Sequence, residues 1–250
     1  MKIVIEKNKE YAFQSFFMGL KQQAQSKRRL AKFDFLKIPK NIIDKTVSIS
    51  GVRKEGYNQK QKKLHSEVKS FFDTLWRGKQ KEVNYVFSLL KKHEGTINWI
   101  VKKVPSYTDL KWPFKEVFIY PNVMSWATKA GNYISVGITP KHFLEKDLVP
   151  VITHELIHVN TDMLKFENLK YPRDSSEMAN TLITGKITRA MNEKFGTLIR
   201  NLKPAVTFRK YNEDWKYLKS LVKNTYDFKI VAGKIDSFLI SKNHEKVYKK

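Results

Sequence analysis

The pentapeptide His-Glu-Leu-Ile-His at residues 154–158 constrains this chain most strongly, because it places two imidazoles and a carboxylate inside the apolar segment 149–163. Apolar spacing of this kind predicts a helix. Side chains four residues apart on a helix lie one above the other, so His154 and His158 can bind one metal ion from the same face. The pattern therefore predicts a zinc-binding helix, with Glu155 as the catalytic carboxylate beside the first imidazole.

The composition indicates a globular protein with few ligand types. The 250 residues are 41% hydrophobic and 13% aromatic, so the chain can bury a core, and we expect one domain built as two lobes. Because it has no long apolar run and no signal-peptide pattern, we expect a cytoplasmic protein without a transmembrane segment. The absence of cysteine excludes disulfides and thiolate ligands, which leaves His, Asp and Glu to bind zinc.

The chain is strongly basic, with 48 Lys and Arg residues against 24 Asp and Glu residues and a net charge of +24. Such a charge attracts nucleic acid, anionic membranes and acidic substrates. We favour a solvated lysine-rich surface instead, because Arg28-Arg29 forms the sole arginine cluster and phosphate recognition usually uses arginine. Nucleic acid thus stays open as a partner but is not the favoured one.

The N-terminal part of the chain combines short secondary-structure signals with many basic residues. A strand is expected at residues 2–6, and the apolar spacing of residues 13–20 predicts a helix. Residues 21–63 are rich in Lys, Arg and Gln, and the alternation at residues 46–52 predicts a short strand among them. We expect residues 1–63 to form a basic strand and helix segment that includes a partly mobile arm.

The middle of the chain predicts two helices followed by a sheet. Apolar spacing over residues 64–90 indicates a pair of helices broken near Gly78 that cover one face of the sheet. A strand is expected at residues 117–120, where Pro121 stops it. A second strand is expected at residues 132–138, where apolar and polar residues alternate.

The remaining segments are predicted to be helical. Asp147 is a suitable N-cap for the zinc-binding helix, and Pro150 is tolerated if it falls in the first turn. A further helix is expected from Asp174 towards Phe195. Segments starting at Asp214 and at Phe228 complete an all-helical C-terminal third.

A catalytic zinc site needs a third protein ligand. A histidine six residues after His158 is excluded, since that position is Leu164. On one continuous helix Asp162 would extend the row of ligands to about 12 Å, and Glu167 would lie about 13 Å beyond His158, both too far for one ion. Glu177 follows a turn at Pro172 and lies near the start of a new helix that can pack back against the first, so these distances favour Glu177.

Glu177 also has an interpretation that needs no metal. With Asp174 as N-cap, the sequence Asp-x-x-Glu at residues 174–177 matches a capping box, in which Glu177 bonds the helix N-terminus. We favour the ligand role, because one residue cannot easily fill both roles. Asp162 and Asn180 are candidates for orienting an imidazole, with an ordinary solvated position as the alternative.

These residues resemble the zincin superfamily of zinc metallopeptidases, and within it the gluzincins, in which the two histidines precede a glutamate ligand on a later helix. The likeness covers residues 117–190. It departs from the family pattern at Asn160, where an apolar residue is usual, and lacks the Trp-x-x-Glu-Gly form of some aminopeptidases around Glu177. The subfamily is therefore unassigned.

The resemblance implies an α+β, zincin-like fold with a small, mostly antiparallel sheet. Residues 64–160 would form an upper lobe with the zinc-binding helix and a substrate-binding edge strand at residues 132–138. Residues 161–250 would form an all-helical lower lobe that carries Glu177. One zinc ion per chain, held by His154, His158 and Glu177, is implied.

The resemblance also implies that the chain hydrolyses peptide bonds of peptide or protein substrates. Zinc would activate a water molecule, and Glu155 would act as general base. An oxyanion donor would come from the C-terminal region, where the candidates are Arg209, Tyr211, Tyr217, Tyr226 and His244.

Three alternatives stay open. One is a basic protein associated with nucleic acid, with DNA-linked proteolysis or a non-catalytic zincin-like domain. Another is a chance match of the pentapeptide in a buried helix. In a third, the N-terminal arm is an inhibitory segment that covers the cleft or binds a partner.

Overall fold

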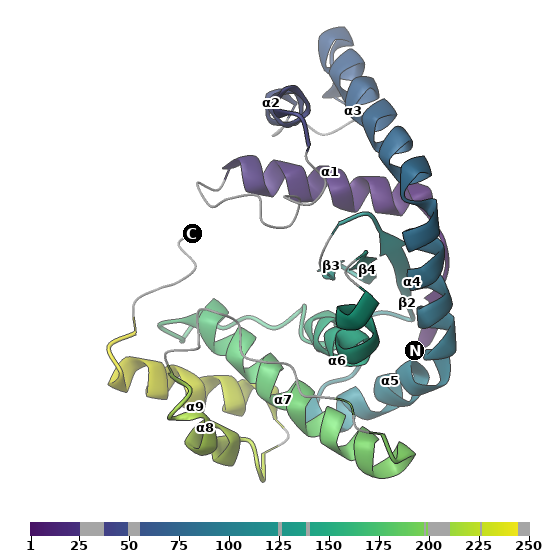
Figure 1. The fold of residues 1–250 in the computed structure, drawn as a ribbon. Helices are drawn as coiled ribbons and strands as arrows, with labels where there is room; N and C mark the ends of the chain where they lie inside the picture. The colour runs from purple at the N-terminus through teal and green to yellow at the C-terminus, as the bar shows by residue number, and fades with distance from the viewer. Residues whose placement is uncertain are drawn as a thin grey trace. The chain divides into compact units, whose positions relative to one another are not determined.

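The computed structural model describes residues 1–25, 38–49, 56–124, 127–138, 141–197, 199, 211–225 and 227–244 (Figure 1). Its helices are α1 (Lys9–Gln25), α2 (Lys40–Ser48), α3 (Gln59–Gly78), α4 (Gln80–Lys92), α5 (Glu94–Thr108), α6 (Lys141–Asn160), α7 (Pro172–Phe195), α8 (Trp215–Leu221) and α9 (Phe228–Ser241). Its strands are β1 (Lys2–Ile5), β2 (Glu116–Asn122), β3 (Thr128–Ala130) and β4 (Tyr133–Gly137). The expected α+β class is confirmed.

The chain divides into two compact units, each assembled from separate stretches of sequence. One unit contains residues 1–3, 93–117 and 145–250, and the other contains residues 4–92 and 118–144. The pentapeptide, Glu177 and the C-terminal helices all belong to the first unit. The boundaries that we expected after residues 63 and 160 stay a prediction.

The sheet is mixed, with the strand order β1-β2-β4-β3. β4 is parallel to β2, whereas β3 is antiparallel to β4. Our expectation of a mostly antiparallel sheet is therefore wrong, and so is that of residues 132–138 as the edge strand. The reason is that β3 lies at the edge of the sheet. After β3 the chain reverses at Gly131, whose φ of 56° suits a tight turn, and continues into β4, which is an inner strand.

Several element boundaries differ from expectation. Residues 46–48 lie in α2 and not in a strand. β2 continues through Pro121, which pairs with Val136, so the proline does not stop the strand. The helix that carries the pentapeptide begins at Lys141, which places Pro150 inside it and not in its first turn.

Capping fixes where α3 begins, and aromatic packing holds α3 against α1. The expected break near Gly78 is confirmed, because α3 ends there and α4 begins two residues later. Asn58 and Gln61 form a capping box that fixes the start of α3. Phe72 on α3 packs against Phe13 and Phe16 of α1, with ring centroids 5.4 and 5.2 Å apart.

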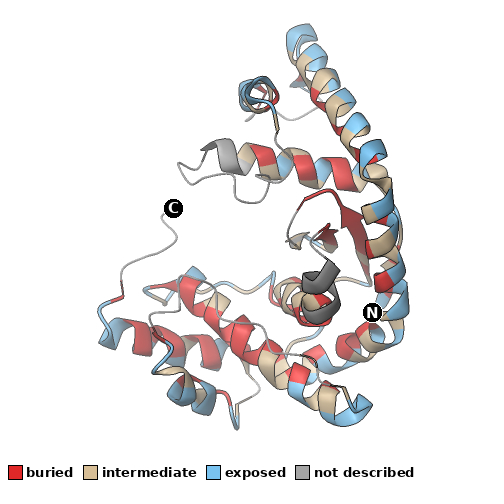
Figure 2. Cartoon of the chain, viewed as in Figure 1, coloured by how far each residue is buried: buried red, intermediate tan, exposed pale blue. Residues whose placement is uncertain are grey.

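The unit that contains the pentapeptide is organised around α7. Figure 2 shows buried residues along most of this helix and on α9, which packs against it. α5, which the sequence did not predict, also packs on α7. The expected C-terminal helices are confirmed as α8 and α9. Among the described residues, no helix is long and apolar enough to cross a membrane.

Candidate metal centre

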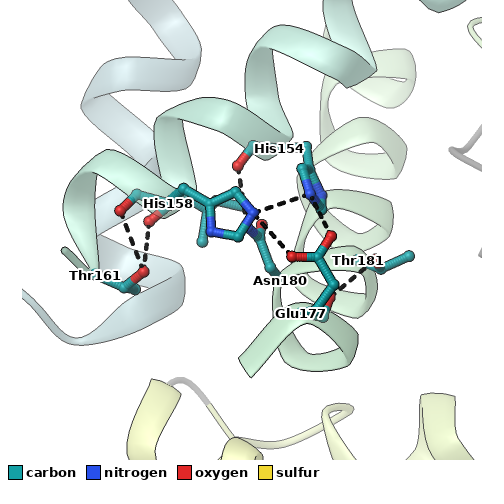
Figure 3. A network of polar contacts seen from close by, with 7 residues as sticks. His154, His158, Thr161, Glu177, Asn180 and Thr181 are labelled. Atoms are coloured by element: carbon teal, nitrogen blue, oxygen red, sulfur yellow. Dashed lines mark hydrogen bonds and ion pairs between the residues drawn. The ribbon is translucent and has the colours of Figure 1, made fainter. Parts of the chain in front are cut away.

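Three predicted ligand residues come together where α7 packs beside α6 (Figure 3). His154 and His158 lie on successive turns of α6, and Glu177 lies in the second turn of α7. The His154 Nε2 and His158 Nε2 atoms are 3.1 Å apart. The two oxygens of Glu177 lie 3.0 Å from His154 Nε2 and 3.1 Å from His158 Nε2. Two imidazoles and a carboxylate thus converge on one point.

The position of Glu177 depends on how α7 begins. Asp236 of α9 accepts hydrogen bonds from the backbone N–H groups of Lys170 and Tyr171 and from the Ser175 hydroxyl. These bonds hold the chain as it enters the helix, which starts at Pro172 and not at Asp174. Since Tyr171 is the N-cap and its side chain makes no capping bond, the capping-box interpretation of Glu177 is wrong.

Two further polar residues join the helices beside these three predicted ligand residues. The Asn180 side chain donates to the backbone carbonyl of His154 at 3.1 Å, so it fixes the register of α7 against α6. The Thr181 hydroxyl donates to the backbone carbonyl of Glu177 at 3.0 Å. Asn180 thus contacts the backbone of a ligand residue and not its imidazole. Sequence spacing gave no signal for this contact, which depends on helix packing.

The cluster has strongly perturbed electrostatics. Burial works against a charged imidazole at His154, but the nearby Glu177 carboxylate outweighs burial and raises the pKa of His154. Burial likewise opposes ionisation of Glu177, yet hydrogen bonds from His154 and His158 hold the pKa of Glu177 well below its usual range. The site therefore holds an ionised carboxylate against imidazoles, an arrangement in which a divalent cation can replace protons.

The spacing of the three groups fits zinc. A tetrahedral ion with bonds of about 2.0–2.2 Å holds its ligand atoms about 3.3–3.6 Å apart. The separations of 3.0–3.1 Å need to widen by a few tenths of an ångström. Two imidazoles and one carboxylate are the ligands of several catalytic zinc sites, in which a fourth position is left for water. Within the described residues, no other group of three or more such side chains has metal-binding spacing.

One buried atom of the cluster lacks a partner. His154 Nδ1 is buried, and it makes no hydrogen bond within the part of the chain that the structure describes. A buried polar atom without a partner costs about 1–3 kcal/mol, so an imidazole with a purely structural role usually has both nitrogens bonded. Because the cluster is formed by the Nε2 atoms, a metal ion bound there would not supply this missing partner.

Comparison with protein-family models, with curated proteins and with solved structures finds no match to this chain.

The other carboxylates that the sequence offered do not join the cluster. α6 ends at Asn160, so Asp162 and Glu167 lie in two turns of the connection to α7 and not on a continuing helix. Neither belongs to the group with metal-binding spacing. Their exclusion as ligands assumed a continuous helix beyond His158, and that assumption is wrong because α6 ends at Asn160.

Asn160, which departs from the zincin pattern, has a structural role at the end of α6. Its side-chain oxygen accepts from the Thr108 hydroxyl at 2.6 Å, and its amide nitrogen lies 3.4 Å from the backbone carbonyls of Leu110 and Lys111. Asn160 is almost fully buried, and these bonds replace the apolar contact expected there. It thereby ties α6 to the end of α5.

The candidate oxyanion donors have different surroundings. Tyr211 and His244 are buried, and the Tyr211 hydroxyl lies 2.6 Å from His244 Nδ1, while His244 Nε2 lies 3.2 Å from Asp174. Tyr217 is exposed and packs against Phe238. Two further candidates, Arg209 and Tyr226, lie outside the described residues.

Proposed function

We propose that this protein is a zinc-dependent metallopeptidase of the zincin type, in which His154, His158 and Glu177 hold one zinc ion. The observation that carries this proposal is the convergence of His154 Nε2, His158 Nε2 and the Glu177 carboxylate at separations of 3.0–3.1 Å. Residues 23 positions apart in sequence supply these groups from two helices. Such a meeting does not follow from the pentapeptide alone, so it supports a metal site independently of the sequence motif.

Zinc bound there would supply a Lewis acid that makes a water molecule nucleophilic near neutral pH. Glu155 is half-buried and follows His154 on α6. On a helix it lies about 100° around the axis from His154 and about 60° from His158, so it flanks both imidazoles. We assign Glu155 as the general base, which accepts a proton from the water and donates it to the amine leaving group.

Asp236 and Asn180 act as positioning residues. Asp236 fixes the turn from which α7 begins, and Asn180 joins α7 to the backbone of His154. Because Glu177 lies between these two contacts along the chain, its carboxylate is held in place from both sides. A rigid ligand set of this kind reduces the entropy that metal binding must overcome.

The test is hydrolysis of a fluorescence-quenched peptide mixture by zinc-loaded full-length protein and by Glu155→Gln. Loss of a general base typically lowers the rate by about 100-fold or more, and we expect this loss while bound zinc is unchanged. Glu167→Gln is the matched control, because Glu167 is an exposed carboxylate outside the metal cluster, and it should retain full activity. Equal activity of Glu155→Gln and the wild type would refute the proposed role.

A further inference from the structure

A cavity of about 370 Å³ lies between α7 and α8, within the same compact unit as the metal centre. Thr181 lines it, and the Thr181 hydroxyl bonds to the backbone of Glu177, so the cavity begins one turn of α7 beyond the ligand. It extends to Arg189, about 18 Å along the helix axis from Glu177. The volume falls within the range of small-molecule sites, about 300–1,000 Å³.

The wall of the cavity carries a concentration of positive charge. Arg189, Lys216, Lys219 and Lys223 line it, and no carboxylate does so among the described residues. The side chains of these four make no hydrogen bond or ion pair within the part of the chain that the structure describes. Lys216 and Lys219 are three residues apart on α8, and Lys223 follows in the turn after it, so these like charges repel one another and the group gains from a bound anion.

A fifth cation has a different role. Lys186 donates to the backbone carbonyl of Val222 and lies over the Tyr107 ring. It therefore holds the end of α8 against α7 and is not counted among the cations available to a ligand. Burial also lowers the pKa of Lys186, as is usual for a lysine taken partly out of water.

Trp215 adds a planar apolar surface to the same cavity. Its indole is half-buried and makes no ring contact with another aromatic side chain among the described residues. Aromatic rings that flank basic side chains bind nucleobases by stacking, while the cations contact phosphate. Carboxylate ligands such as acidic peptides do not require an aromatic partner.

We propose that this cavity binds a nucleotide, with the base against Trp215 and the phosphates against Lys219, Lys223 and the neighbouring cations. The nucleotide can be free or can belong to a single strand of nucleic acid, since both present the same base and phosphate. This inference does not rest on the proposed peptidase function, because none of the four cations contacts the metal cluster.

The test is isothermal titration calorimetry of the full-length protein with ATP, in EDTA and at low salt. EDTA keeps metal out, so failure of the zinc proposal does not affect the result. We expect Lys219→Ala/Lys223→Ala to raise the Kd for ATP at least tenfold. Lys62→Ala/Lys81→Ala is the matched control, because it removes the same charge from exposed positions on α3 and α4, and it should change the Kd less than twofold.

A second variant tests the role of the ring. Trp215→Leu should weaken binding of ATP at least fivefold and leave binding of inorganic tripolyphosphate, which has no base, unchanged. A 5′-phosphorylated thymidine oligonucleotide tests whether the nucleotide belongs to a strand. If it binds more tightly than ATP, the ligand is a single strand of nucleic acid. If it binds more weakly, the ligand is a free nucleotide.

Three results would overturn the proposal. The first is an equal loss of ATP binding in the control double variant, which would assign the binding to overall charge. The second is an equal effect of Trp215→Leu on ATP and tripolyphosphate. The third is binding of hexaglutamate more tightly than ATP, which would make the cavity a site for acidic peptides.

Discussion

Replacement of Glu177 by glutamine tests how the carboxylate stabilises the metal-free cluster. The variant keeps the shape of the side chain but removes the charge that faces His154 and His158 at 3.0 and 3.1 Å. A hydrogen bond to a charged group contributes about 1.5–3 kcal/mol. Because the two Nε2 atoms are 3.1 Å apart and repel each other when both are protonated, we count one such bond. The expected loss is about 2 kcal/mol of unfolding free energy at about pH 6.

The loss should depend on pH. The two imidazoles lower the pKa of Glu177. Its contribution to the unfolding free energy is therefore full above the usual carboxyl pKa and is lost in strong acid. The pKa of His154 is raised by Glu177, so its contribution is full below 6.5 and fades as pH rises through the raised value. The loss should therefore be smaller at about pH 9 than at about pH 6, because His154 loses its proton as pH rises through its raised pKa.

The assay is urea unfolding followed by circular dichroism in EDTA at both pH values. Glu167→Gln is the control, because it makes the same chemical change at an exposed carboxylate and should leave stability unchanged within about 0.5 kcal/mol. An equal loss for Glu177→Gln at both pH values, or an equal loss for the control, would refute the reasoning that Glu177 faces a protonated imidazole.

Three further predictions concern the supports of the site. Asp236→Ala should lower the unfolding free energy by about 2–4 kcal/mol, because three donors lose their acceptor, and it should weaken zinc binding measured by competition with a chelator. Asn160→Leu should cost about 1–3 kcal/mol in urea unfolding while zinc affinity is retained, since Asn160 bonds α5 and not the ligands; unchanged stability would contradict this role. Zinc affinity should fall as pH decreases from about 8 to 6, because protons compete for His154, whose pKa is raised by Glu177; a pH-independent affinity would be inconsistent with imidazole ligands.

The three residues of the candidate metal centre were predictable because their positions follow largely from local geometry. Helical periodicity alone places His154 and His158 on one face, and both lie on α6. Glu177 was favoured because Asp162 and Glu167 were excluded, although α6 ends earlier than that exclusion assumed. A new helix after a turn can approach the first one from the side, and α7 does so.

Features that depend on tertiary packing were not predictable. The sheet order places β4 between β2 and β3, and alternating side chains carry no information on strand direction. α6 begins nine residues before Pro150, because burial in a packed helix outweighs one missing backbone bond. The four cations of the cavity are dispersed between residues 189 and 223, so only the packing of α8 beside α7 brings them together.

The most direct test of the central claim is metal analysis by mass spectrometry after zinc loading and gel filtration. The wild type and Glu155→Gln should each retain one zinc ion per chain, because Glu155 is not a ligand. His154→Ala, His158→Ala and Glu177→Ala should each lose most of it, since each removes one of the three groups that converge within 4.8 Å of one another. A wild type that retains no zinc, or the same zinc content in all three ligand variants, would contradict the claim.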